Sequence, residues 1–398
     1  MGLEEGRSTR VNGPIDIQPF VIAIPEEQLA ALKVRLRETR WPAPFAGGWD
    51  YGTDLAFVQN LSEFWEQTFD WRAREAQLNR LPQYRAMIGG LGIHFIHQPG
   101  TGPVPLPLLL THGWPGSFVE MERLVPLLAD PGSYGGDPAD AFDVVVPSLP
   151  GFGFSDAPRG PGVNSRQIAR LWAELMGALG YERFGAQGGD IGAGVSTWLG
   201  FDHAARVIGL HLNYIPGSYR PPLGEGEPPQ TAEEAAFLER VAAWNEEEGA
   251  YGHLQGTRPQ TLAYGLSDSP VGLAAWIAEK FVAWTDSGGD GRGVAPEALL
   301  TNIALYWFTN TIGSSVRLYR ENRLAPMQFG PGERVRPPLS VALFPRELPL
   351  PPRSWVERVY DLRRWTPMPR GGHFAAMEEP ELLAADIRAA FRPLREQR

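Results

Sequence analysis

The sequence predicts an α/β protein: a mostly parallel sheet of eight strands with helices on both faces, an inserted helical lid and an amino-terminal meander. Short apolar runs of strand length alternate with helical stretches, which is the order expected for a parallel sheet. A linker rich in proline and glycine interrupts that order and leads into a long helical segment. The 398 residues, 43% of them hydrophobic, can build a substantial core as one large domain or two.

Composition and charge exclude several classes of protein. The net charge of -10 argues against a nucleic-acid partner, and the absence of cysteine excludes disulfides and thiolate catalysis. Residues 1–7 are polar and acidic, unlike a signal peptide, and Gly6 does not fit a myristoylation motif. The longest apolar run, around residues 106–110, is only strand length. We therefore expect a cytoplasmic chain without a membrane anchor.

Residues 1–80 form the expected amino-terminal extension. A helical pattern runs over residues 24–37, with three leucines on one stripe: Leu29, Leu32 and Leu36. Four tryptophans then punctuate segments without strand alternation: Trp41, Trp49, Trp65 and Trp71. We interpret this extension as a meander packed on the outside of the core, in preference to an independent binding module.

The core is expected over residues 81–215 and 324–398. Residues 84–88 and 93–97 have the pattern of a strand hairpin. Further strands are predicted at residues 106–111, 144–147, 183–187, 207–212, 339–344 and 365–368. Helices are predicted at residues 165–179 and 380–391.

Residues 216–323 are expected to form the lid. Residues 216–229 are a Pro/Gly-rich linker, and Thr231 with Glu234 then makes a capping box at the start of a helix. The remainder is helical and rich in aromatic residues, so we interpret it as a lid inserted after the sixth strand.

Asp190 is the candidate nucleophile. It follows a strand and precedes a helix, and Gly188 and Gly192 leave room for a sharp strand-to-helix turn. Unpaired N–H groups at the start of that helix would keep its carboxylate ionised. Because a carboxylate attacks carbon to form an alkyl ester, the substrate is expected to be a strained ether or an alkyl halide. The structural alternative is an ordinary aspartate at the N-cap of a helix.

His373 and Glu347 are the candidate base and the acid that orients it. His373 lies between glycines and phenylalanine just past the last strand, and Glu347 follows the penultimate strand. Asp361 is the rival acid, but it precedes the last strand and should lie at the wrong end of the sheet. His94 and His97 share a strand without carboxylate or cysteine neighbours, so no metal site is expected.

The turn Thr-His-Gly-Trp-Pro-Gly at residues 111–116 is a candidate oxyanion hole. It would present the backbone N–H of Trp114 opposite that of Ile191, giving an oxyanion two donors. His112 would shape the turn. A purely structural turn is the alternative.

With these motifs, the sequence resembles the epoxide hydrolases of the α/β-hydrolase fold, in the microsomal-type branch with an amino-terminal extension. The likeness covers nearly the whole chain and rests on residues 69–72, 112–117, 149–155, 186–194 and 371–376. It implies two lid tyrosines that hold the epoxide oxygen, matched here by Tyr251 and Tyr319, although both could simply pack the lid. Ile191 departs from the tryptophan often found after the nucleophile in this branch, so the pocket wall must differ. The membrane anchor of the animal enzymes is absent, which implies a soluble relative.

The expected reaction is hydrolysis of an epoxide to a vicinal diol through an ester on Asp190. Water activated by His373 and Glu347 would hydrolyse that ester, and Tyr251 and Tyr319 would assist ring opening. The expected partners are a small epoxide and water, with no nucleic acid, metal or organic cofactor. A homodimer, the natural epoxide and its enantiomer are left open.

Two rival functions stay open in the sequence. A haloalkane dehalogenase shares the nucleophile and base, but needs side-chain N–H donors for halide, which Ile191 cannot supply. A catalytically dead hydrolase fold that binds a ligand usually lacks a nucleophile or base, whereas here each role has a candidate. A serine esterase is disfavoured because the turn holds no serine.

Overall fold

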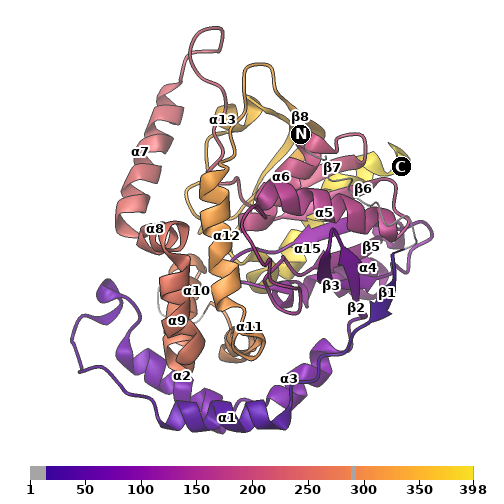
Figure 1. Cartoon of the computed structure of the whole chain (residues 1–398). Helices are drawn as coiled ribbons and strands as arrows, with labels where there is room; N and C mark the ends of the chain where they lie inside the picture. The colour runs from indigo at the N-terminus through magenta and orange to yellow at the C-terminus, as the bar shows by residue number, and fades with distance from the viewer. Residues whose placement is uncertain (1–14, 288–292, 398) are drawn as a thin grey trace, which may run out of the picture.

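A central sheet of nine strands organises the chain in the computed structural model, which describes residues 15–287 and 293–397 (Figure 1). The order is β1-β2-β3-β5-β4-β6-β7-β8-β9. The neighbouring strands from β1 to β5 in this order pair antiparallel, and those from β5 to β9 pair parallel. The strands are β1 (Ile17–Pro19), β2 (Gln83–Ile88), β3 (Leu91–Gln98), β4 (Leu106–Thr111), β5 (Phe142–Pro147), β6 (Phe184–Gly188), β7 (Val207–Leu212), β8 (Val335–Leu343) and β9 (Tyr360–Pro367).

The sequence-based count of eight strands was therefore one too low for the described residues. The additional strand, β1, has three residues and pairs with β2 at the edge of the sheet. A strand this short has no alternation to detect, because its place depends on backbone pairing with a distant strand.

Helices cover both faces of the sheet, as the sequence predicts. On β7, Leu210 contacts Gly200 of α6 (Asp190–Asp202), while the next position, Gly209, faces Phe391 of α15 (Pro380–Phe391). Because neighbouring residues of a strand point to opposite faces, α6 and α15 lie on opposite sides of the sheet. Helix α5 (Ser165–Ala178) packs on α6, and α4 (Leu124–Ala129) packs on α15.

The extension contains more helix than the sequence indicates. Helices α1 (Glu26–Arg37), α2 (Leu55–Gln67) and α3 (Trp71–Leu78) run beneath the lid in Figure 1. Helices α1 and α2 contact α10 of the segment predicted as the lid. The ring of Trp71 meets that of Phe308 edge-on, with centroids 4.9 Å apart. Residues 26–78 therefore contact the segment predicted as the lid through α10 and α11 (Pro296–Thr309).

Six helices form the segment predicted as the lid: α7 (Ala232–Glu247), α8 (Ala250–Thr257), α9 (Pro259–Asp268), α10 (Pro270–Trp284), α11 (Pro296–Thr309) and α12 (Ile312–Leu324). The predicted capping box is present, since Thr231 and Glu234 exchange hydrogen bonds at 3.0 and 3.1 Å. Glu234 also forms a buried ion pair with Arg358, which binds the lid to the core. Two short helices, α13 (Arg353–Glu357) and α14 (Ala375–Glu378), complete the core.

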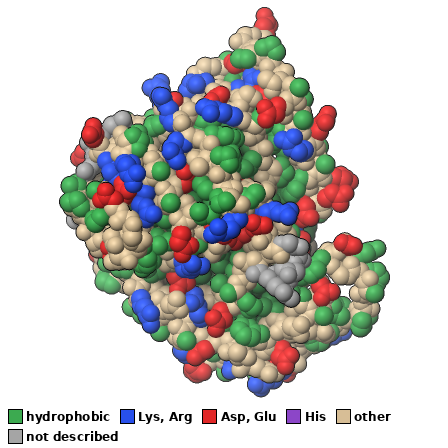
Figure 2. Space-filling model, turned by 180° about the vertical axis from the view of Figure 1, so that it is seen from behind, with side chains coloured by type: hydrophobic (Ala, Val, Ile, Leu, Met, Phe, Trp, Pro, Cys, Tyr) green, Lys and Arg blue, Asp and Glu red, His purple; other side chains and the backbone are tan. Residues whose placement is uncertain are grey.

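The surface is of mixed charge. On the face in Figure 2, acidic and basic side chains are interspersed among apolar ones. Within residues 15–287 and 293–397, no helix combines the length and the apolar character needed to cross a membrane.

Candidate active site

Asp190 stands at the sharp turn between β6 and α6. Its backbone φ of 45° lies in the left-handed region, which residues other than glycine rarely adopt. A Cβ at Gly188 would overlap the carbonyl group of Gly192, and a Cβ at Gly192 would overlap the carbonyl oxygen of Thr111. Gly188 and Gly192, two residues on either side of Asp190, therefore have the steric role that the sequence predicts for them.

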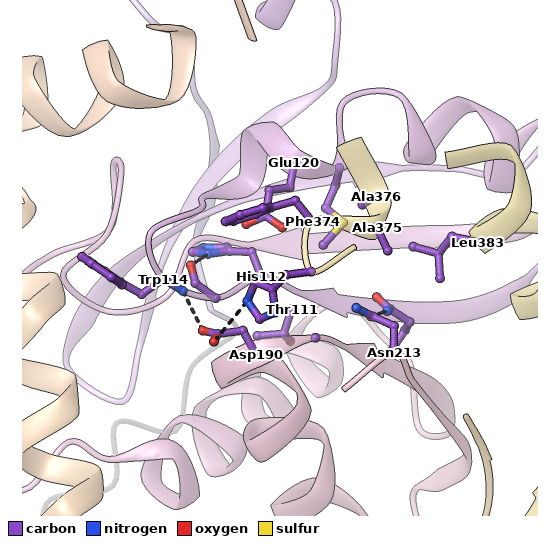
Figure 3. A pocket seen from close by; sticks show the side chains of 15 residues that line it. Thr111, His112, Trp114, Glu120, Asp190, Asn213, Phe374, Ala375, Ala376 and Leu383 are labelled. Atoms are coloured by element: carbon purple, nitrogen blue, oxygen red, sulfur yellow. Dashed lines mark hydrogen bonds and ion pairs between the residues drawn. The ribbon is translucent and has the colours of Figure 1, made fainter. Parts of the chain in front are cut away.

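The carboxylate of Asp190 is held by two groups. The backbone N–H of Trp114 donates to its Oδ1 at 2.8 Å (Figure 3). Nε2 of His373 lies 3.4 Å from its Oδ2. A Cβ at Gly113 would overlap this carboxylate, so the turn after β4 approaches Asp190 with bare backbone. The N–H of Ile191, the second predicted donor, remains a prediction.

His112 stabilises this turn. Leu149 N–H donates to its Nε2 at 3.2 Å, so Nδ1 carries the proton and donates to the carbonyl of Gly113 at 3.0 Å. Burial lowers the pKa of His112 to about 4, which keeps the ring neutral. Tyr306, which the sequence indicates as core, is buried and donates to the carbonyl of Gly116 at 2.7 Å.

His373 lies between two carboxylates. Its Nδ1 is 2.5 Å from Oε1 of Glu347, whose side chain is fully buried at the end of β8. Burial alone would lower the pKa of His373, but Glu347 and Asp190 outweigh it and hold that pKa well above its ordinary value. Asp361, the rival acid, lies near the amino end of β9 and pairs with Arg363.

Tyr251 of α8 and Tyr319 of α12 lie side by side near this group. The ring of Tyr251 stacks on Trp114 with centroids 5.6 Å apart, and Tyr319 meets Trp114 edge-on at 5.6 Å. The two phenol rings are 5.8 Å apart, and their hydroxyl groups interact. Burial raises the pKa of both phenols well above the ordinary value, so both hydroxyl groups are protonated at neutral pH.

A cavity of about 1590 Å³, counting its part open to solvent, connects the carboxylate to the phenols. Asp190, Tyr251 and Tyr319 all line it. Its walls include a set of apolar side chains: Ile191, Trp198, Trp244, Met327 and Leu348. Polar side chains, among them Arg220, Asn322 and Arg323, line it as well. The arrangement puts one carboxylate and two O–H donors around a space with both apolar and polar walls, which suits a largely apolar molecule with a reactive oxygen.

The sequence did not single out three residues of this site. Tyr214, just after β7, lines the same cavity and lies 5.9 Å from the ring of His373. Its place after a parallel strand could have marked it, because such residues gather at one edge of the sheet. The backbone carbonyl of Trp284 accepts a hydrogen bond from the backbone N–H of His373 at 2.9 Å. Glu120 lines a second, smaller pocket beside Asp190.

Comparison with known proteins finds similar sequences and a similar structure among epoxide hydrolases. The sequence model described as "Epoxide hydrolase N terminus" matches residues 17–121, and the one described as "alpha/beta hydrolase fold" matches residues 107–247. A protein of Stigmatella aurantiaca (strain DW4/3-1) named as an epoxide hydrolase is 48% identical, over 95% of this chain and 86% of its own. Epoxide hydrolase 1 of Oryctolagus cuniculus is 40% identical, over 93% and 88%. The structure of Aspergillus niger epoxide hydrolase superposes with a TM-score of 0.81 at 32% identity, over 96% of this chain and 97% of that one.

Proposed function

This chain belongs to the epoxide hydrolases of the α/β-hydrolase fold, and we propose that it opens its substrate through a covalent ester on Asp190. The observation that supports this most is that Asp190 lines one cavity together with two protonated phenols. Asp190 attacks one ring carbon, the carbon–oxygen bond breaks, and Tyr251 and Tyr319 donate hydrogen bonds to the departing oxygen. A phenol is far more acidic than an alkoxide, so it assists even with a raised pKa.

The second step is hydrolysis of the ester. In the free enzyme, the negative charges of Asp190 and Glu347 raise the pKa of His373. Ester formation removes the charge of Asp190, so the pKa of His373 falls when a base is required. His373 then takes a proton from water, whose oxygen attacks the ester carbon. As the ester bond breaks, the imidazolium gives its proton to the departing oxygen. The second proton of the water, left on the carboxyl group of Asp190, passes to the alkoxide oxygen that ring opening produced.

Backbone donors would stabilise the intermediate of that step. The N–H of Trp114 already donates to Asp190 Oδ1, and we assign the N–H of Ile191 as the second donor. Removing one such donor typically costs about 3 kcal/mol of transition-state stabilisation.

We also propose the division of labour between parts of the chain. Residues 81–215 and 324–398 form the core and supply the nucleophile, base and acid, while residues 216–323 form the lid and supply both phenols. Residues 1–80 form the extension. The contacts of α1 and α2 with α10 support a role for the extension in supporting the lid.

A single-turnover reaction in heavy-oxygen water tests the covalent route. With styrene oxide as the probe and enzyme in excess, the label should enter the carboxylate of Asp190, because water attacks the ester carbon. Mass spectrometry of the peptide that contains Asp190, and of the diol, measures this. Label found in the diol with Asp190 unlabelled would rule out the ester. Halide release from a chloroalkane without diol formation would indicate a dehalogenase instead.

A further inference from the structure

Asp190 lines two cavities. The larger one, described above, contains Tyr251 and Tyr319. The smaller one is lined mainly by the end of β4 and the turn after it, by Glu120 and Met121, by the β6–α6 turn and by residues 373–376 (Figure 3). The space inside it is enough for about one water molecule. His373 is among the residues that line this smaller cavity and is not among those that line the larger one.

Glu120 contributes a carboxyl group to the smaller cavity from a short 3-10 helix (Phe118–Met121). A Cβ at Gly116 would overlap its Oε1, so a glycine at that position of the turn is what makes room for the carboxyl group. Burial raises the pKa of Glu120 to about 8. The charge of His373 and hydrogen bonds from the backbone of Ser117 and Gly113 lower this pKa, and the charge of Asp190 raises it. Glu120 therefore lies within electrostatic reach of both groups that react with water.

The two-cavity arrangement bears on the second step of the reaction. Once the ester forms, the substrate chain fills the larger cavity beside Asp190. Water that reached the ester carbon from that side would compete with the chain for space. The smaller cavity contains His373 and a face of Asp190, and its polar groups give a water molecule the two or more partners that it needs.

We propose that the smaller cavity holds the hydrolytic water and that Glu120 is a further catalytic residue, which binds this water together with His373. The proposal rests on the ester mechanism above. One O–H of the water gives its proton to Nε2 of His373, and its oxygen attacks the ester carbon of Asp190. The other O–H donates to a carboxyl oxygen of Glu120, which accepts in either protonation state and takes no proton. The ester bond then breaks: His373 gives its proton to the departing oxygen, and the proton left on the carboxyl group of Asp190 passes to the alkoxide oxygen that ring opening produced.

Rapid mixing with styrene oxide, followed by intact-protein mass spectrometry, separates formation of the ester from its hydrolysis. Glu120→Leu removes the acceptor, and we expect it to slow ester hydrolysis about tenfold or more while ester formation changes by less than about threefold. Glu120→Gln keeps one carbonyl acceptor and should recover part of the lost rate. Unchanged ester formation in the same sample shows that the variant is folded with an intact nucleophile.

Two controls make the outcome decisive. Glu122→Gln alters a carboxylate two positions along, which pairs with Arg74, and should slow neither step selectively. His373→Gln should trap the ester. If that variant traps the ester but Glu120→Leu hydrolyses it at the wild-type rate, the role of Glu120 is overturned and the ester mechanism stands. If Glu120→Leu slows both steps equally, Glu120 only shapes the turn and the proposal is wrong. If no ester forms on His373→Gln, the ester mechanism itself fails.

Discussion

At the scale of single residues, the proposed mechanism gives the phenols of Tyr251 and Tyr319 the same task, hydrogen bonding to the departing oxygen. They come from different helices yet line one cavity with Asp190, and burial keeps both protonated. We expect Tyr251→Phe and Tyr319→Phe each to slow ester formation about 10- to 100-fold, because the other phenol still assists. The double variant should lose about 10³-fold or more. Rapid mixing with detection of the ester by mass spectrometry measures this step.

Tyr214→Phe is the matched control. Tyr214 lines the same cavity, but its hydroxyl interacts with the backbone of Gly217. Loss of this hydroxyl should change ester formation by less than about threefold. A double variant of Tyr251 and Tyr319 that forms ester at the wild-type rate would remove the phenols from the mechanism.

How far a site residue could be predicted depended on where it stands along the chain. Asp190, Glu347 and His373 each follow a strand of the parallel sheet, and the ends of such strands converge at one edge. The lid tyrosines came only from the family resemblance, because tertiary packing alone brings their helices to the site. Glu120 lies on a short 3-10 helix and Trp284 at the end of a lid helix, and no local pattern marks either one.

At the scale of elements, the close approach of α6 to β4 makes a sharp prediction. A Cβ at Gly192 would overlap the backbone oxygen of Thr111, which cannot move aside, so Gly192→Ala should destabilise the fold by about 3 kcal/mol. Gly194 is in the same helix, but a Cβ there meets only side chains, at 3.7 Å or more. Gly194→Ala should be neutral or stabilising by up to about 1 kcal/mol. Urea denaturation followed by tryptophan fluorescence compares the two, and equal losses would contradict this account.

The elements that sequence patterns missed are those defined by distant partners. Strand β9 begins at Tyr360, several residues before the predicted start, because Arg363 and Arg364 hide its apolar character. These arginines are accommodated because β9 is an edge strand of the described sheet. Helix α2 has a regular buried stripe and a side-chain cap from Asp54, so its pattern was present in the sequence but obscured by the surrounding tryptophans.

At the scale of the whole molecule, one buried carboxylate connects the closing helix to the sheet and sets the response to acid. Asp386 of α15 lies 3.0 Å from Nε2 of His211 on β7 and 2.9 Å from Arg364 on β9. Burial alone would raise the pKa of Asp386, but these partners lower it from 3.8 to about 2. Because the folded pKa is below the unfolded one, the stabilisation is present above about pH 4 and is lost as the pH falls toward 2. It amounts to about 2 kcal/mol.

The Asp386→Asn variant isolates this contribution. Wild type should exceed the variant in unfolding free energy at pH 6, and the difference should shrink by about 2 kcal/mol on acidification to pH 2.5. Urea denaturation across that range measures it. Asp361→Asn is the control, because Asp361 pairs with Arg363 in a more exposed position and should show a smaller change. A difference that does not vary with pH would show that Asp386 acts only through packing.

The position of Asp190 between two cavities has a consequence for engineering. In the proposed mechanism, the walls of the larger cavity would contact the substrate and discriminate between enantiomers, whereas hydrolysis of the ester would depend on the smaller cavity. Substitutions confined to Trp244, Met327 and Leu348 should therefore change enantioselectivity while the rate of ester hydrolysis stays the same. Enantioselectivity and the rate of ester hydrolysis could then be improved separately, and the substitutions combined in one enzyme.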